Sequence, residues 1–338
     1  MAKEGPGAEV IRGLLKKFPD TASRTLARKA YSGNKALWPN PTACLTQLRV
    51  IRGKAGDKKR KSVADKSQFR NKIERQDFPK LPDSLEGKDG WQVVEIDTPG
   101  PWGIISDIHL PFHNLPALRC ALKEGKRRGW KGILINGDLF DFPQFSRFEK
   151  KKEDGQFAKD LYAGRQFLDA INDAFPRARK VFKFGNHDLH YSRWMWGKCP
   201  ELLDVAETSL ENLLDCDRFG FEVYNKNEPI KLGKLIVLHG HEFGQGSTTS
   251  PVSPAKTLHD RLKESGLCSH WHKKSNFESP QPVSEHVIGC YSIGCLCGLH
   301  PDWARLNQWG HGAATVDVSK DGAFETDNFK IVHGLKWR

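Results

Sequence analysis

The stretch Trp102-Gly-Ile-Ile-Ser-Asp-Ile-His-Leu-Pro111 indicates the fold of the largest part of the chain. Its short apolar run, Gly103 to Ile105, is typical of a buried strand. Asp107 and His109 follow this run, and residues two positions apart on an extended segment point to the same side. A carboxylate and an imidazole on one side of a strand end can hold one metal ion.

Four segments farther along the chain repeat this pattern, each with an apolar run that ends in residues of metal-ligand type. They supply Asp138, Asn186, His239 and the pair His270 and His272. Glycines precede Asp138 and Asn186 and permit tight turns that aim those side chains inward. Because the carboxyl ends of strands in an open α/β sheet meet at one crevice, we expect the ligands to meet there. Seven nitrogen and oxygen ligands are too many for one tetrahedral ion and predict a pair of ions about 3.5–4 Å apart.

Composition limits the class of protein. The chain has 338 residues, of which 38% are hydrophobic and 28% charged, as in ordinary globular proteins. No apolar run approaches the roughly 18 residues needed to span a membrane, and the N-terminus lacks the pattern of a signal peptide.

Cys290, Cys295 and Cys297 with His286 fit no common zinc pattern and are expected to be core cysteines. The eight scattered cysteines indicate no disulfide framework, so we expect a cytoplasmic location and no membrane partner.

The positive charge is concentrated at the N-terminus. The formal net charge is +12, and residues 1–90 hold 21 Lys+Arg against 10 Asp+Glu, a net +11. Residues 91–338 hold 32 against 31, a net +1. A basic appendage on a near-neutral body predicts an anionic partner, most often nucleic acid, DNA or RNA. A solubilising tail is the alternative, and protein partners stay unknown.

Residues 1–53 are predicted to form a basic three-helix module that resembles a helix-turn-helix. Apolar residues at helical spacing predict helices over 9–18, 21–31 and 42–52. Arg49 and Arg52 on the polar side of the third helix are candidate nucleic-acid contacts, although any small three-helix bundle would show this pattern. Residues 54–90 are predicted to be a basic polar linker. It supplies further candidate contacts: Lys58, Lys59, Arg60 and Lys61.

Residues 91–338 alternate strands with helices and then end in strands, which favours an α/β fold with mixed sheets. Strands are predicted over 92–96, 102–106, 132–136, 180–184, 221–224, 234–238, 267–269, 286–293, 313–318 and 324–332. Helices are predicted over 115–128, 156–173, 201–214 and 253–265.

The five segments resemble the five signatures of the calcineurin-like metallophosphoesterases, in order and in spacing. The matching residues are Asp107-x-His109, Gly137-Asp138-x-x-Asp141, Gly185-Asn186-His187-Asp188, His239-Gly240 and His270-x-His272, over about residues 101–275. Ser269 departs from the family, which usually has Gly at this turn. The resemblance implies a two-sheet mixed β-sandwich flanked by helices, here preceded by the helical module. The chain also looks like bacteriophage-type phosphoesterases with a basic N-terminal extension, whose location would be the host cytoplasm.

The resemblance further implies a role for each matching residue. Asp107, His109 and His272 would hold the first metal ion, Asn186, His239 and His270 the second, and Asp138 would bridge both. His187 would act near the scissile phosphate as general acid or charge stabiliser, and Asp188 would orient it. The ligand types favour manganese and leave iron, zinc, nickel and cobalt open.

Four residues close to the motifs are assigned with alternatives. Asp141 is expected to support the site without binding metal, and His241 either to support it or to bind metal. Tyr191 and Arg193 follow the third motif and are candidate substrate contacts, with Arg193 on phosphate and an aromatic ring under a base. Packing in the core is an equal alternative for this segment.

These features predict a two-metal-dependent phosphoesterase that hydrolyses phosphodiester bonds by in-line attack of a metal-bridging hydroxide. Nucleic acid is the expected substrate, because the run from Gly137 to Asp141 resembles DNA-repair nucleases of the superfamily. A phosphomonoesterase or protein phosphatase is one alternative. A nucleic-acid-binding protein with a mainly structural metal site is another, but such a site would not need His187.

Overall fold

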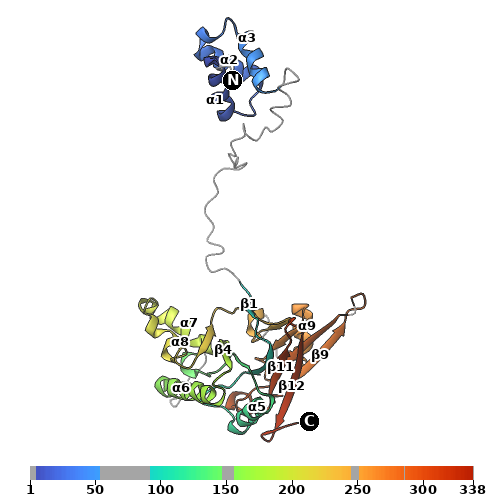
Figure 1. Ribbon diagram of the computed structural model, residues 1–338. Helices are drawn as coiled ribbons and strands as arrows, with labels where there is room; N and C mark the ends of the chain where they lie inside the picture. The colour runs from blue at the N-terminus through green and yellow to red at the C-terminus, as the bar shows by residue number, and fades with distance from the viewer. Residues whose placement is uncertain (1–4, 54–91, 147–155, 245–250, 285, 338) are drawn as a thin grey trace. The chain divides into compact units, whose positions relative to one another are not determined.

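The computed structural model describes residues 5–53, 92–146, 156–244, 251–284 and 286–337 (Figure 1). The chain divides into two compact units, Met1–Leu85 and Glu86–Arg338. The predicted linker and the predicted contacts Lys58–Lys61 lie outside the described residues. None of the described helices is long and apolar enough to cross a membrane.

The N-terminal unit contains three short helices around a core of its own. They are α1 (Pro6–Lys17), α2 (Ser23–Gly33) and α3 (Pro41–Ile51), with the 3-10 turn η1 (Lys35–Leu37) between the last two. Ile11, Leu26 and Leu48, one from each helix, are buried in this core. Asn40 starts α3, because its side chain accepts a hydrogen bond from the backbone N–H of Ala43 at 2.9 Å.

Arg49 and Arg52 differ in their surroundings. Arg49 is exposed on α3. Arg52 is half-buried, and its guanidinium donates to Ser23 Oγ at 2.9 Å and to the backbone oxygen of Pro19. These bonds tie the end of α3 to the segment between α1 and α2, and they give Arg52 a structural role; its contact with nucleic acid stays a prediction.

The second unit, called the catalytic unit below, is built on two sheets. The seven-stranded sheet has the order β13 (Leu335–Lys336), β12 (Phe324–Val332), β11 (His311–Val318), β2 (Gly100–Ile105), β3 (Gly132–Asn136), β4 (Arg179–Lys183) and β5 (Phe221–Tyr224). The six-stranded sheet has the order β1 (Val94–Ile96), β6 (Ile230–Leu232), β7 (Leu235–Val237), β8 (Gly266–Cys268), β10 (Val287–Ser292) and β9 (Ser275–Pro280). The predicted mixed α/β fold with two sheets is confirmed.

Alternate residues of the central strands face two different cores. Ile104 and Leu134 pack against Val237 and other residues of the six-stranded sheet, so this core lies between the sheets. Ile105 and Ile133 face the opposite side. There they are covered by the helices α5 (Leu115–Arg128) and α6 (Phe157–Ala174). Burial of both faces explains why the strands are continuous apolar runs.

Two helices and several strand assignments differ from the prediction. The helix α7 (Asp188–Lys198) was not predicted, and the predicted helix 201–214 is mostly short turns with a single-turn helix α8 (Leu210–Leu213). The strand β1 pairs with β6 in the six-stranded sheet, whereas β2, the next strand in the chain, lies in the seven-stranded sheet. The strand β9 was missed because its side chains are polar or half-buried. The helix α9 (Pro254–Leu262) packs on β8 and β10.

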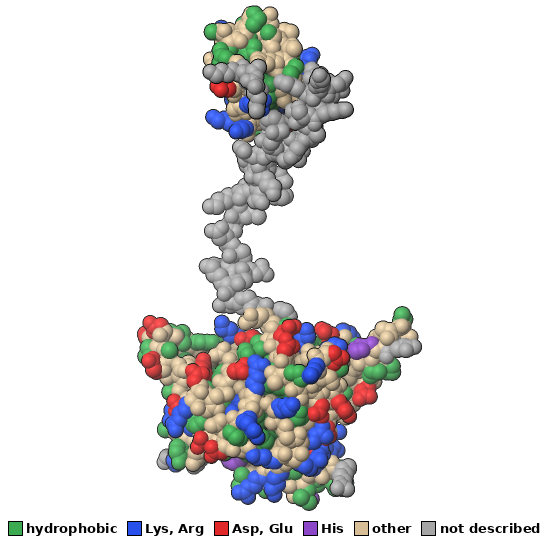
Figure 2. All heavy atoms as spheres, in the orientation of Figure 1, with side chains coloured by type: hydrophobic (Ala, Val, Ile, Leu, Met, Phe, Trp, Pro, Cys, Tyr) green, Lys and Arg blue, Asp and Glu red, His purple; other side chains and the backbone are tan. Residues whose placement is uncertain are grey.

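Acidic and basic side chains are mixed on the surface of the catalytic unit that Figure 2 shows. This agrees with the net +1 of residues 91–338. Any concentration of positive charge on this unit must therefore be local.

Candidate metal centre

The seven predicted ligands come together where strands of both sheets end. Asp107 and His109 follow β2, Asp138 follows β3, and Asn186 follows β4. These three strands are neighbouring and parallel, so their carboxyl ends meet at one edge. The six-stranded sheet contributes His239 after β7, and His270 and His272 after β8. The centre therefore spans the two sheets.

Asp138 lies between the two predicted ligand groups. Its Oδ2 is 3.2 Å from His239 Nε2 on one side and 3.8 Å from His109 Nε2 on the other. Asn186 Oδ1 lies 3.3 Å from His239 Nε2. On the other side, Asp107 Oδ1 lies 3.1 Å from His272 Nε2. This arrangement is compatible with one metal in each group and Asp138 between them.

The remaining nitrogens of the histidine rings test whether the residues fit metal ions. His239 Nδ1 donates to the backbone oxygen of Asn136 at 2.8 Å, and His109 Nδ1 donates to Asp141 Oδ1 at 2.8 Å. Both rings thus present an Nε2 lone pair to the centre, as metal-binding histidines do. His109 Nε2 is buried and has no hydrogen-bond partner among the described residues. A divalent cation would satisfy it, so the residues fit the metals that the family resemblance implies.

The backbone at the ligands is strained. Five of them have a positive φ: Asp107 (51°), His109 (50°), Asp138 (51°), His270 (68°) and His272 (57°). Residues other than glycine rarely adopt this conformation, and it costs about 1–3 kcal/mol each. Hydrogen bonds between the ligand loops help to hold it, because Asp107 N donates to Gly137 O at 3.1 Å and His109 N to Asp138 O at 3.1 Å.

The electrostatics of the centre favour positive charge. Burial alone would raise the pKa of Asp138, but the attraction of His239 and His187 outweighs it and holds that pKa well below the ordinary value. Burial alone would lower the pKa of His239, whereas Asp138 raises it to about 9. Carboxylates that hold protons on neighbouring imidazoles in this way would also attract metal cations.

Asp141, and not Asp188, contacts the predicted general acid. His187 Nδ1 donates to the backbone oxygen of Asp141 at 2.9 Å and lies 3.5 Å from its carboxylate. Asp188 is fully buried and accepts hydrogen bonds from the backbone N–H groups of Phe140 and Gly185, at 3.1 and 2.9 Å. The orienting role assigned to Asp188 is therefore wrong, because its oxygens brace the loops that carry Asp138 and Asn186.

His241 lies beside the centre and binds a surface residue. Its Nε2 is 2.7 Å from Asn227 Oδ1, and its ring centroid is 5.2 Å from that of His239. Glu242, which sequence reasoning missed, accepts the backbone N–H of His239 at 2.8 Å. The buried Lys183 of β4 forms an ion pair with Glu242 at 2.8 Å, so these residues fix the loop that carries His239.

Tyr191 and Arg193 do not form one substrate site. Tyr191 is buried in α7, where it stacks on Phe157 with ring centroids 5.0 Å apart and donates to the backbone oxygen of Thr208 at 2.7 Å. The packed ring and the occupied hydroxyl favour the packing alternative for Tyr191, and its contact with substrate stays a prediction. Arg193 is exposed on α7.

The three cysteines are buried, as predicted, but Cys295 and Cys297 both contact His272 of the metal centre. Cys297 Sγ lies 3.9 Å from His272 Nδ1, and its sulfur, with one nitrogen each of His109 and His272, forms a group of possible metal ligands within 4.8 Å. His286 is exposed and lies at the start of β10. The sequence signal for Cys297 was only its position after a buried strand.

Ser269 replaces the usual glycine without strain. Its Oγ donates a hydrogen bond to the backbone oxygen of Asn136 at 3.1 Å and accepts one from the side-chain amide of Asn136 at 3.1 Å. The Asn136 amide also donates to Leu238 O at 2.7 Å. These bonds join the two sheets directly beneath the ligands, and Asn136 was not identified from the sequence.

The fold and the ligand set define a metal-dependent phosphoesterase, a hydrolase of ester bonds. The sequence model of the calcineurin-like phosphoesterase family matches residues 101–318. The chain belongs to this family.

Phage proteins are among the relatives. Gene 54 protein of Mycobacterium phage L5 is 27% identical over 192 residues, which cover 55% of this chain and 71% of that protein. Gene 54 protein of Mycobacterium phage D29 is 27% identical over 227 residues, covering 63% and 88%.

Similar solved structures include a single mutant of Vps29 from Entamoeba histolytica, with 14% identity, coverage of 69% of this chain and 99% of that chain, and a TM-score of 0.33. The phosphoesterase Yfce from E. coli has 16% identity, coverage of 67% and 98%, and a TM-score of 0.31.

Proposed function

We propose that the chain is a two-metal phosphodiesterase that acts on nucleic acid. The observation that carries the two-metal part is the position of Asp138, with one ligand group on each side of its carboxylate. Asp107, His109 and His272 would hold one ion, and Asn186, His239 and His270 the other. Manganese is our first expectation for both, because the set combines carboxylate, amide and imidazole ligands.

Bound divalent cations would supply charge to hold phosphoryl oxygens and would lower the pKa of water for attack. The chain's own residues supply the rest. His187 lies at the edge of the centre, with its ring centroid 4.6 Å from that of His109. Because its Nδ1 is committed to Asp141, its Nε2 is the atom that could deliver a proton to the leaving oxygen.

The nucleic-acid part of the proposal rests on charge. The described residues of the N-terminal unit, 5–53, contain nine Lys+Arg and two Asp+Glu. Phosphodiester backbones are the commonest polymeric partner of such a surface. Arg49 and the segment Lys58–Lys61 are the proposed contacts, and the host cytoplasm is the proposed location.

The test combines metal analysis with a substrate panel. Metal-saturated protein is expected to contain about two transition-metal ions per chain and to hydrolyse a phosphodiester faster than a phosphomonoester. Single- and double-stranded DNA and RNA complete the panel. Asp138→Asn is expected to abolish hydrolysis with an unchanged far-UV circular dichroism spectrum. A single ion at saturation would refute the two-metal site, and preference for monoesters would favour a phosphomonoesterase or protein phosphatase.

A further inference from the structure

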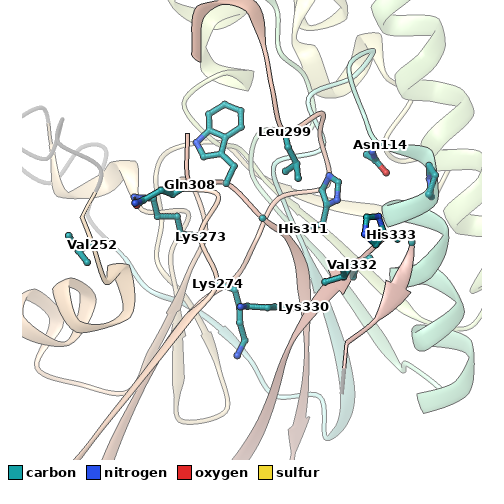
Figure 3. Close-up of a pocket in the computed structure, with 15 residues that line it drawn as sticks. Asn114, Val252, Lys273, Lys274, Leu299, Gln308, His311, Lys330, Val332 and His333 are labelled. Carbon is teal, nitrogen blue, oxygen red and sulfur yellow. The ribbon is translucent and has the colours of Figure 1, made fainter. Parts of the chain in front are cut away.

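The catalytic unit contains a groove of about 760 Å³ (Figure 3). Its walls come from segments far apart in the chain, namely the start of α5, the residues before β9, the residues before β11, and the end of β12. The polar side chains that line it include Lys273, Lys274, His311, Lys330 and His333. Among the described residues that line it, none is acidic.

Residues that line the groove contact a predicted metal ligand, His272, which does not itself line it. Lys273 follows His272 in the chain, and the indole ring of Trp309 lies 4.1 Å, centroid to centroid, from the His272 ring. The backbone N–H of Gly310 donates to His272 O at 2.9 Å. The wall of the groove therefore packs against the ligand group of Asp107, His109 and His272 through His272.

Two lysines give the groove its charge. Lys274 and Lys330 lie side by side in Figure 3, although Lys274 directly precedes β9 of the six-stranded sheet and Lys330 lies in β12 of the seven-stranded sheet. Burial lowers the pKa of Lys274, and the nearby Lys330 lowers it further, against a smaller opposing effect of Asp327. Asp327 itself pairs with Lys336 at 2.6 Å. Two ammonium groups held together without a lining carboxylate favour a bound anion.

Lys273 has a structural role that differs from that of Lys274 and Lys330. Its Nζ donates to Gln308 Oε1 at 3.1 Å and to Pro251 O at 3.3 Å, so it joins two walls of the groove. Figure 3 shows Lys273 beside Gln308. We therefore assign the anion contacts to Lys274 and Lys330.

A pair of tryptophans, the half-buried Trp309 and the exposed Trp303, extends from the wall of the groove. Trp309 lies edge-to-face against Trp303, with centroids 5.4 Å apart, and the Trp303 side chain is 77% exposed. An indole ring in water beside cationic side chains is a stacking platform for a nucleobase. Bases inside a duplex are already stacked and paired, so such a platform selects unpaired nucleotides.

We propose that this groove binds a single-stranded polynucleotide, with phosphates at Lys274 and Lys330 and a base on Trp303. The inference rests on the proposed function, because it gives the nucleic-acid substrate a binding track that ends at the metals. A strand in the groove would present its next phosphodiester to the ligand group that includes His272.

The first experiment measures the affinity of the full chain for a fluorescein-labelled oligothymidylate in EDTA, which keeps the strand intact. Each phosphate contact with a single strand contributes a slope of about −0.7 to log K against log salt. The double variant Lys274→Ala/Lys330→Ala is expected to flatten this slope by about 1.4 and to weaken binding about 10- to 30-fold near 0.1 M salt.

The matched control is Lys234→Ala/Lys320→Ala, which removes the same charge. Both residues are exposed at the opposite end of the β11–β12 hairpin, about 25 Å along the strands at about 3.4 Å per residue. The control is expected to bind as the wild type does. Equal losses of affinity in the two variants would refute the groove as the binding site, because such losses would reflect net charge alone.

A second experiment locates the strand directly, because the N-terminal unit is also proposed to bind nucleic acid. Ultraviolet cross-linking of an oligonucleotide that carries 5-iodouridine, followed by peptide mass spectrometry, is expected to label the segment from Trp303 to Trp309. Trp303→Ala is expected to remove that adduct. Cross-links confined to residues 1–90 would overturn the groove.

A third measurement distinguishes an error in the groove proposal from an error in the proposed phosphodiesterase function. Hydrolysis of bis(p-nitrophenyl) phosphate by the wild type tests the diesterase and needs no groove. Hydrolysis without groove-dependent binding would refute the groove alone. Groove-dependent binding without hydrolysis of any diester would refute the phosphodiesterase and leave the binding site.

Discussion

At the level of single residues, His187 combines a fixed ring with a free nitrogen. Its Nδ1 is held by Asp141, and burial is the main cause that lowers its pKa below the ordinary value. A lowered pKa leaves His187 mostly neutral near pH 7, so the acid would be the minor imidazolium form, which gives up its Nε2 proton readily. Asp141 also binds His109 at 2.8 Å, so one carboxylate orients a proposed metal ligand and the proposed acid.

His187→Ala is expected to slow hydrolysis of alkyl diesters about 10²- to 10⁴-fold, and of p-nitrophenyl esters much less, because an activated leaving group needs no proton. Steady-state rates on the two ester classes, together with metal analysis, check this. Metal content is expected to stay at the wild-type value. An equal loss on both classes would indicate that His187 positions the phosphate.

At the level of secondary structure, the strand ends explain why the site was visible in the sequence. A buried parallel strand requires an apolar run, and the residue after it lies at the crevice, so both signals are local. Side chains of α7 could not be assigned in this way. Tyr191 follows a motif directly but turns into the core, and no local pattern distinguishes packing from substrate contact.

Two glycines at these strand ends have different physical roles. Gly137 has a φ of +87°, a conformation that favours glycine. Gly185 does not have a positive φ, but a Cβ atom there would overlap the Asp138 carboxylate. The turn chemistry expected of both glycines therefore applies only to the first, and the second is required by close approach.

Gly185→Ala is expected to displace Asp138 and so to lower metal occupancy and activity at least tenfold, while Gly197→Ala serves as control. Gly197 lies in α7, and a Cβ there would meet nothing within 4 Å. The metal affinity is measured by titrating metal into each variant in a calorimeter. Unchanged metal affinity in Gly185→Ala would show that displacement of Asp138 does not weaken metal binding.

Glu124 on α5 ties that helix to the last strand. It accepts from Arg127 at 2.6 and 2.8 Å and from Lys336 of β13 at 2.8 Å. Hydrogen bonds from Arg127 are the main cause that lowers the pKa of Glu124 to about 2, from 4.5. A carboxyl group with a lowered pKa stabilises the fold above its unfolded pKa and loses this effect as the pH falls through its folded pKa.

Glu124→Gln is therefore expected to lower the free energy of unfolding by about 1 kcal/mol at pH 7, given that Arg127 is largely exposed. The difference from the wild type is expected to shrink between pH 4.5 and pH 2. Urea unfolding across this range checks it, with Glu325→Gln on the exposed side of β12 as control. A constant difference would mean that packing, and not charge, is lost.

At the level of the whole molecule, charge separates the two units more clearly than any motif does. The first quarter of the chain carries nearly all of the excess positive charge. Composition alone revealed this, because net charge needs no knowledge of contacts. Composition could not separate Arg49 from Arg52, since a guanidinium that binds backbone oxygens looks the same in a sequence as one that faces water.

Arg49→Glu and Arg52→Ala are expected to act differently. Arg49→Glu should weaken duplex DNA binding and flatten the salt slope by about 0.9 per lost contact, with an unchanged melting temperature. Arg52→Ala should lower the melting temperature of the N-terminal unit, because it removes the bonds to Ser23 and Pro19. Anisotropy titrations and calorimetry check both. A wild-type salt slope in Arg49→Glu would exclude α3 from the interface.

The division of the ligands between the two sheets also sets when, during synthesis, the protein can take up metal. A nascent chain that ends before residue 239 carries Asp107, His109, Asp138 and Asn186, but none of the ligands from the six-stranded sheet. Metal affinity arises only when the ligands are assembled by folding. For the proposed ligand set, complete loading would therefore be a late event that awaits residue 272.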